Sequence, residues 1–269
     1  MFGEKLEGLL TPCPRHLRTM GYLRELIGMK ARFKRCRSAW EPHLERTRAV
    51  IRMARDRCPQ RRTAVILGSS YLRTVLVPEL APYFREVVLV DIVHPLGTLW
   101  PARKWKNVST RAADVTGVVE AVFHAAQAQG SELPHFLPDL FCDDPDVDLV
   151  ASVNLLSQLT LLPVKYLMHA GTHDRDTITD FARDLIDSHF EYLRRLPGTV
   201  ALIADVEHLK VDPKGSVVER VDTLHGVPLP WTGEEWIWDI APRPEADWNL
   251  NHLRRVVGIA DVKTARAAA

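Results

Sequence analysis

The sequence predicts an α/β fold in which helices cover both faces of a mostly parallel, doubly wound sheet. Short apolar runs of strand length alternate along the chain with longer segments that carry apolar residues at helical spacing. This alternation is typical of parallel sheets, because each parallel strand needs a crossover connection. The chain has 269 residues, of which 46% are hydrophobic. That is enough for one large core with an appendage rather than two equal domains.

Residues 63–91 show the pattern most clearly. The apolar run Ala64–Leu67 ends at Gly68, a segment with helical spacing follows, and a second apolar run ends at Asp91. In a Rossmann-type unit, the turn after the first strand brings backbone N–H groups to the ligand. A carboxylate about 20 residues further on contacts the ribose hydroxyls. Gly68 and Asp91 stand in this relation, so we expect a nucleotide-type cofactor.

The rest of the chain continues the same alternation. We expect strands at 107–113, 148–153 and 199–205, and helices at 95–104, 116–129, 156–170 and 177–196. Beyond the fifth strand, the runs 217–224 and 235–240 alternate between apolar and polar residues, and we interpret them as an antiparallel pair added to the sheet. The connection 208–216, between the fifth strand and this pair, is too short to contain a helix.

The N-terminal part is basic. Residues 15–62 hold 15 Lys or Arg and four acidic residues, whereas residues 63–269 hold 19 Lys or Arg and 28 acidic residues. We therefore divide the chain into a helical cap, 1–62, and a cofactor-binding domain, 63–269. The favoured interpretation is that the cap packs over the acidic body. The alternative is an electrostatic surface for nucleic acid, although no nucleic-acid-binding motif is present.

Composition excludes several other classes. No apolar run approaches the roughly 20 residues needed to cross a bilayer, and the first ten residues lack the apolar stretch of a secretory signal, so we expect a cytoplasmic protein. The four cysteines show no paired spacing for zinc or disulfides. His169, His173 and Asp174 do not have the spacing of a helical ligand pair, so no metal site is predicted.

The motifs resemble those of class I S-adenosylmethionine-dependent methyltransferases. That family has a glycine-rich first motif and an acidic residue at the end of the second strand, which match Gly68 and Asp91. It has an acidic residue after the third strand and an Asp-Leu-Val run in the fourth, which match Asp114 and the run from Asp148. The matches come in the same order and cover about residues 60–210. The family usually has two or three glycines in the first motif, whereas this chain has one. The resemblance implies that S-adenosylmethionine is held by Gly68, Ser69, Ser70, Asp91, Ile92, Asp114, Val115 and Asn154.

The same resemblance, together with the strand order, predicts where a substrate would bind. Ligands of open α/β sheets lie outside the carboxyl ends of the strands. We therefore expect the substrate, a small molecule that accepts a methyl group, to contact Ser157, Gln158, Asp205 and Trp231. A base is useful if the acceptor must lose a proton, and His208 or Glu207 is the candidate by position.

Other functions compete with this one. Ser70 lies between a strand and a helix, as the nucleophile of a hydrolase does, with Asp205 and His225 later in the chain. An NAD-dependent dehydrogenase would also use Asp91, but the full glycine fingerprint is missing. Transfer of the aminocarboxypropyl group would need a similar adenosine site. A non-enzymatic binding or regulatory module would keep the fold and use the basic cap as its interaction surface.

Overall fold

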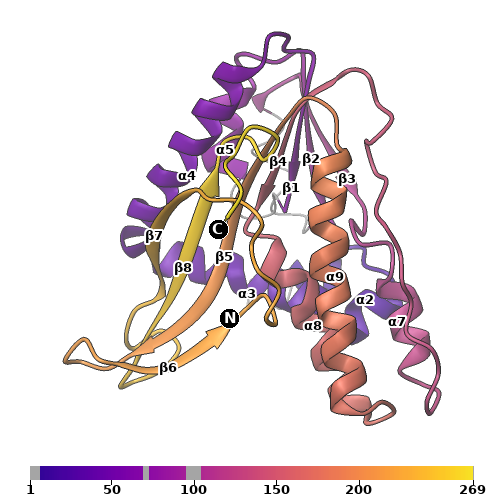
Figure 1. Cartoon of the computed structure of the whole chain (residues 1–269). Coiled ribbons are helices and arrows are strands. Elements are labelled where there is room, and N and C mark those ends of the chain that lie inside the picture. The colour runs from indigo at the N-terminus through magenta and orange to yellow at the C-terminus, as the bar shows by residue number, and fades with distance from the viewer. Residues whose placement is uncertain (1–6, 69–72, 95–103, 269) are drawn as a thin grey trace.

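An eight-stranded sheet forms the centre of the molecule (Figure 1). The computed structural model describes residues 7–68, 73–94 and 104–268. The strands are β1 (Thr63–Leu67), β2 (Glu86–Asp91), β3 (Val108–Ala112), β4 (Val147–Val153), β5 (Thr199–Val211), β6 (Val217–Asp222), β7 (Glu234–Ala241) and β8 (Asn251–Ile259). The helices are α2 (Arg15–Met20), α3 (Tyr22–Arg35), α4 (Arg37–Arg57), α5 (Arg73–Leu80), α7 (Val119–Ala125), α8 (Leu156–Ala170) and α9 (Arg175–Arg195).

The order of the strands is β3-β2-β1-β4-β5-β8-β7, with β6 paired to β5 outside this path. Strands β1 to β5 pair in parallel, and β8 is antiparallel to both β5 and β7. It follows that β7 runs in the direction of β5. This arrangement is a Rossmann-like, mostly parallel sheet with antiparallel C-terminal strands, and it confirms the predicted fold class. The expected helix at 95–104 lies almost wholly outside the described residues.

The C-terminal pairing differs from the prediction. The strand at 217–222 forms a hairpin with β5, through a turn in which the Asp212 N–H donates to the Ser216 carbonyl. The antiparallel partner of β7 is instead β8, which the sequence analysis missed. A five-residue connection favours a hairpin over a crossover. The first five residues of β8 are all half-buried, so that they lack the alternation that marks a strand with one solvent face.

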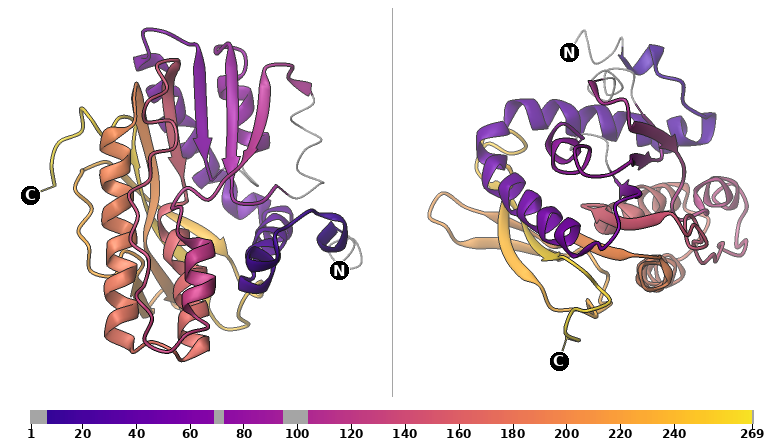
Figure 2. Two further views of the ribbon diagram at one scale, coloured as in Figure 1. Left: turned by 90° about the vertical axis from the view of Figure 1, so that its right-hand side faces the viewer. Right: turned by 90° about the horizontal axis from the view of Figure 1, so that it is seen from above.

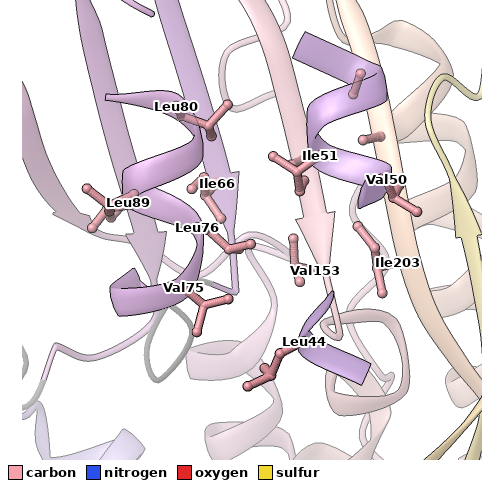
Figure 3. Packing of buried hydrophobic residues seen from close by; sticks show 14 of the residues in the cluster. Leu44, Val50, Ile51, Ile66, Val75, Leu76, Leu80, Leu89, Val153 and Ile203 are labelled. Atoms are coloured by element: carbon pink, nitrogen blue, oxygen red, sulfur yellow. The ribbon is translucent and has the colours of Figure 1, made fainter. Parts of the chain in front are cut away.

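Helices cover the two faces of the sheet in separate layers (Figure 2). On one face, α4 and α5 pack on the central strands, and Leu44 and Ile51 of α4 face Val153 and Ile203 (Figure 3). On the other face, α9 contributes Ile186, Phe190 and Leu193 to a second cluster. The connection 223–233 reaches this second face without a helix. Each face is therefore buried, as a parallel sheet requires.

The N-terminal helices close the carboxyl edge of the sheet. Helix α3 lies across the ends of β1, β2 and β4, where its residues line the same cavities as those strand ends (Figure 1). Several arginines of the basic segment pair with carboxylates of the body. These pairs are Arg35 with Glu245, Arg46 with Glu234, Arg52 with Glu79, and Arg62 with Asp146 and Asp148. In the described part of the chain, no helix combines the length and apolar character needed to cross a membrane.

Candidate functional site

Two adjacent cavities lie at the carboxyl ends of the parallel strands. The first is narrow, about 60 Å³, and is bounded by the ends of β1, β2 and β3 and by α3. The second is about 390 Å³ and is bounded by α8, α3 and the outer strands β5 to β8. Glu25, Met29, Gln158 and Leu161 line both cavities. The two spaces therefore share walls, as neighbouring cofactor and substrate sites would.

Gly68 forms the turn at the end of β1. Its φ is +78°, a conformation that residues with a Cβ adopt at a cost. A Cβ at this position would also lie 2.7 Å from the carbonyl oxygen of Val153 and 3.2 Å from Cβ of Leu155. Both the conformation and the close approach require glycine here. Ser69 and Ser70 lie outside the described residues.

Asp91 ends β2 and is 9% exposed at the edge of the first cavity. One of its carboxylate oxygens accepts a hydrogen bond from the Ile92 N–H at 2.8 Å. Ile92 itself is half-buried and supplies an apolar wall to the same cavity. The structure therefore brings Asp91 and Ile92 next to Gly68, in the relation that the sequence predicts.

Asp114 and Val115 lie just after β3, the neighbour of β2, and line the same cavity. The carboxylate of Asp114 accepts from the backbone N–H groups of Thr116 and Val119 at 2.9 Å each, and from the Thr116 hydroxyl at 2.6 Å. These bonds fix the turn before α7. Val115 is buried and adds a second apolar wall. With Ile92, it gives the cavity the apolar sides that suit a planar ring.

Asn154 belongs to the second cavity rather than the first. It follows β4 with a positive φ of 49°, which asparagine tolerates better than most residues. Ser157 and Gln158, in the first turn of α8, line the second cavity. The Ser157 hydroxyl donates to Asp205 at 2.8 Å, and the Gln158 amide donates to the Asn154 carbonyl at 2.6 Å.

Strand β5 is longer than the sequence predicts, so that Asp205, Glu207 and His208 lie within it rather than after it. Asp205 and His208 both line the second cavity. Glu207 faces the other side of the sheet, where it accepts from Arg220 at 2.7 Å and from Arg255 at 2.8 Å. The structure thus separates the two residues that position alone made equal candidates for a base.

His208 is neutral near pH 7. Burial, and after it the positive charges of Arg254, His252 and Lys210, lower its pKa to about 4. Its Nε2 atom is buried and has no hydrogen-bond partner among the described residues. A neutral imidazole can accept a proton, but the lowered pKa makes this one a weak base.

Trp231 lies on the opposite face of the sheet from the second cavity. Its ring is 7% exposed, with its centroid 5.5 Å from that of Phe190, and the guanidinium of Arg194 lies 5.1 Å above it. Trp231 belongs to the connection 223–233, which packs on this face of the sheet without forming a helix. Trp231 lines neither of the two cavities at the strand ends; on the far face it lines a separate surface cavity together with Glu207 and Arg255.

The remaining predicted side chains also have defined positions. His225 lines the second cavity, with Nε2 3.0 Å from the Thr160 hydroxyl oxygen. His173 contacts Ser131, and Asp174 caps α9. In residues 7–68, 73–94 and 104–268, no three His, Cys, Asp or Glu side chains are grouped to hold a metal ion. Trp238 lines the second cavity from β7, where the sequence allowed either an aromatic wall for a substrate or a core residue. Sequence reasoning missed Arg254, which lines the second cavity from the unpredicted β8.

Comparison with known proteins gives distant structural likenesses. No protein-family model matches the sequence, and no curated protein matches it. The N-methyltransferase NodS from Bradyrhizobium japonicum WM9 is 14% identical, with a TM-score of 0.36 over 81% of this chain and 97% of NodS. The DhpI-SAM-HEP complex is 12% identical, with a TM-score of 0.38 over 91% of this chain and 99% of that one.

A third similar structure is the 1,6-didemethyltoxoflavin-N1-methyltransferase of Burkholderia thailandensis with bound 1,6-didemethyltoxoflavin and S-adenosylhomocysteine. It is 14% identical, with a TM-score of 0.31 over 88% of this chain and 90% of that one. Likeness at this level does not assign a reaction or a substrate. The fold follows from the strand order of the sheet, and the activity has to be argued from the two cavities.

Proposed function

We propose that the protein is a methyltransferase that uses S-adenosylmethionine and acts on a small molecule. The observation that supports this most is the first cavity, in which Gly68, Asp91 and Val115 surround one space at the ends of three adjacent parallel strands. A carboxylate at the end of β2 suits the ribose hydroxyls, and the glycine turn lets backbone approach the ligand. Ile92 and Val115 would contact the adenine ring.

The residues present fit the chemistry of this cofactor. The Asp91 carboxylate is held by the Ile92 N–H, so it would meet the ribose already oriented. S-adenosylmethionine supplies a methyl group on a positively charged sulfur, which becomes a neutral thioether when a nucleophile takes the methyl group. Ser157 holds Asp205 in the second cavity by a 2.8 Å hydrogen bond. The chain's task would be to align the acceptor and exclude water.

His208 would act as the base for an acceptor that must lose a proton. It is neutral and lines the second cavity, and its Nε2 has no partner among the described residues. Glu207 is not proposed for this role because it is paired with two arginines on the far face of the sheet. The pairing of Arg35, Arg46 and Arg62 with body carboxylates supports a capping role for the basic segment over nucleic-acid binding.

The test is calorimetric titration of the full chain with S-adenosylmethionine, S-adenosylhomocysteine, NAD and NADP. We expect binding of the two sulfur nucleotides alone. Asp91→Asn should weaken that binding by about 1–3 kcal/mol, the range for a lost hydrogen bond to a charged group. The matched control is Glu86→Gln, at the exposed start of the same strand. Binding of NAD alone would support the dehydrogenase, and binding of none would refute cofactor use.

A further inference from the structure

We propose that the second cavity binds an oxyanion, a carboxylate or phosphoryl group carried by a small organic molecule, through hydrogen bonds donated by Trp238, Arg254 and Asn154. The description of that molecule as the methyl acceptor rests on the proposed function. The binding site itself does not, because it is defined by side chains that lie outside the first cavity.

The site is built on a row of residues across three neighbouring strands. His208 of β5 lies opposite Arg254 of β8, and Arg254 lies opposite Trp238 of β7. Directly opposite residues have their Cβ atoms about 4.5–5.5 Å apart on one face of the sheet. All three residues line the second cavity. Their polar groups are therefore gathered on one wall of a single space.

Two donors in this row have no acceptor in the part of the chain that the structure describes. Nε1 of Trp238 and Nε of Arg254 are buried and have no hydrogen-bond partner among the described residues. The Trp238 side chain is only 2% exposed. Leaving a buried N–H group unpaired costs free energy, and structures normally avoid it. Neither nitrogen is accessible in the structure, so a ligand oxygen bound against this wall would give each group an acceptor after small movements of the two side chains.

A third donor follows from the protonation of His43. Burial lowers the pKa of His43 to about 3, so the ring is neutral. Trp236 Nε1 donates to His43 Nδ1 at 3.0 Å, which places the ring's proton on Nε2. His43 Nε2 lies 3.1 Å from the side-chain amide of Asn154. A donor on Nε2 requires an acceptor opposite it, so the amide presents its oxygen there.

The amide nitrogen of Asn154 then takes the other position, which is buried and has no partner among the described residues. Asn154 is 1% exposed and lines the second cavity. The amide therefore contributes an unpaired donor rather than an unpaired acceptor. With Trp238 and Arg254, three neutral or cationic N–H groups are available, a set that selects an oxygen-rich, negatively charged partner.

Charges on the two faces of the sheet support this assignment. On the far face, Arg255 donates to both Glu207 and Glu235, so its charge is matched. On the cavity face, Arg254 meets only Asp205, at 3.4 Å, and Asp205 already accepts from Ser157. Asp222 also lines the cavity, but its two oxygens accept from the backbone N–H groups of Leu224 and Gly226. Arg32, Lys165 and Glu25 complete the charged lining.

The cavity also has room for an apolar body beside the oxyanion. Its volume of about 390 Å³ lies within the usual range for small-molecule sites. Its apolar lining comes from Met29, Leu161, Val164, Val221 and Ile240. We therefore expect an organic acid of modest size rather than a free inorganic ion.

The experiment titrates the full chain, without cofactor, with benzoate, phenyl phosphate and the uncharged control benzamide. Calorimetry gives affinity, and the indole N–H resonances in an NMR spectrum report on Trp238. We expect at least one of the two anions to bind about tenfold more tightly than benzamide, which is about the effect of one hydrogen bond to a charged group. The same anion should shift the Trp238 resonance. The preferred anion identifies a carboxylate or a phosphoryl site.

Variants separate this role from a structural one. Trp238→Phe keeps an aromatic side chain but removes the donor together with the pyrrole part of the indole, and Arg254→Lys keeps the charge but removes Nε. Each should weaken anion binding about tenfold. The melting temperature should fall by a few degrees for Trp238→Phe, which loses buried volume, and by less for Arg254→Lys, because neither removed donor has a hydrogen-bond partner among the described residues. Arg255→Gln, the neighbour that faces the other way, should bind the anions as the unaltered protein does.

Equal binding of benzamide and both anions, or unchanged anion affinity in both Trp238→Phe and Arg254→Lys, would overturn the inference. A separate titration with S-adenosylmethionine distinguishes the two proposals. Cofactor binding without anion binding would refute the oxyanion site alone. Anion binding without cofactor binding would refute the methyltransferase alone.

Discussion

Asp205 and His208 lie three residues apart in β5, yet both line the second cavity. In a regular strand, residues an odd number apart point to opposite faces. A bulge between Asp205 and Glu207, opposite Val256 and Arg255 of β8, adds one residue to this stretch. The shift turns His208 onto the face of Asp205 and Glu207 onto the other. One inserted residue therefore decides which side chain reaches the candidate site.

The first prediction concerns the protonation of His208. Because burial and the nearby positive charges stabilise the neutral ring, we expect His208 to titrate with a pKa of about 4. Arg254→Gln removes one of those charges and should raise the pKa. NMR titration of the histidine ring protons measures both. A pKa at the ordinary value in the unaltered protein, or no rise in the variant, would contradict this account.

The second prediction concerns Gly68. Gly68→Ala adds a Cβ 2.7 Å from the Val153 carbonyl oxygen, besides the strain of a φ of +78°. Gly215→Ala is the matched control, since its φ is +87° and no atom lies within 4 Å of the added Cβ. The control should lose about 1 kcal/mol of unfolding free energy from strain alone. Urea denaturation should show a larger loss for Gly68→Ala, and equal losses would argue against the close approach.

The third prediction tests the position of Trp231. Trp231→Ala should destabilise the protein by about 3–5 kcal/mol, as expected for loss of a buried aromatic side chain. The control is Trp248→Ala, because Trp248 is 83% exposed and its loss should leave the unfolding free energy almost unchanged. Thermal or urea unfolding measures the difference. Weakened ligand binding in a Trp231 variant of unaltered stability would instead indicate a substrate contact.

The fourth prediction concerns acid stability. Burial lowers the pKa of His189 to about 4, below the ordinary value of about 6.5 that holds in the unfolded chain. Between these values the unfolded state binds more protons, so stability falls as the pH falls, by up to about 1.4 kcal/mol per pH unit for this group. His189→Gln should flatten that slope in urea unfolding at pH 7 and pH 5. The exposed His124→Gln should leave the slope unchanged, and equal slopes in all three proteins would exclude this role for His189.

The sequence predicts the inner part of the sheet well. Strands β1, β2 and β4 are short apolar runs, and the residues at the ends of β1 and β2 follow from those runs. Strand β3 is polar and exposed, and its place follows from the order of the elements. That is why Gly68, Asp91, Asp114 and Val115 come together as expected. These positions depend on local pattern and parallel topology alone.

The outer part of the site could not be predicted in the same way. The row from His208 to Trp238 depends on β8, which lacks clear alternation, and on a bulge, which a local pattern does not reveal. The sequences of β6 and β7 both alternate between apolar and polar residues, so the pattern does not decide that β6 pairs with β5 and β7 with β8. The partners of these strands are determined by contacts between residues far apart in the sequence, which local periodicity does not predict.

Helix α3 supplies Glu25 and Met29 to both cavities. A nucleotide bound in the first cavity would contact this helix. Any shift of the helix also reshapes the wall of the second cavity. The occupancy of one space then alters affinity in the other, and by thermodynamic necessity the effect is equal in both directions. We therefore expect each ligand to change the measured affinity for the other by the same factor, whichever is added first.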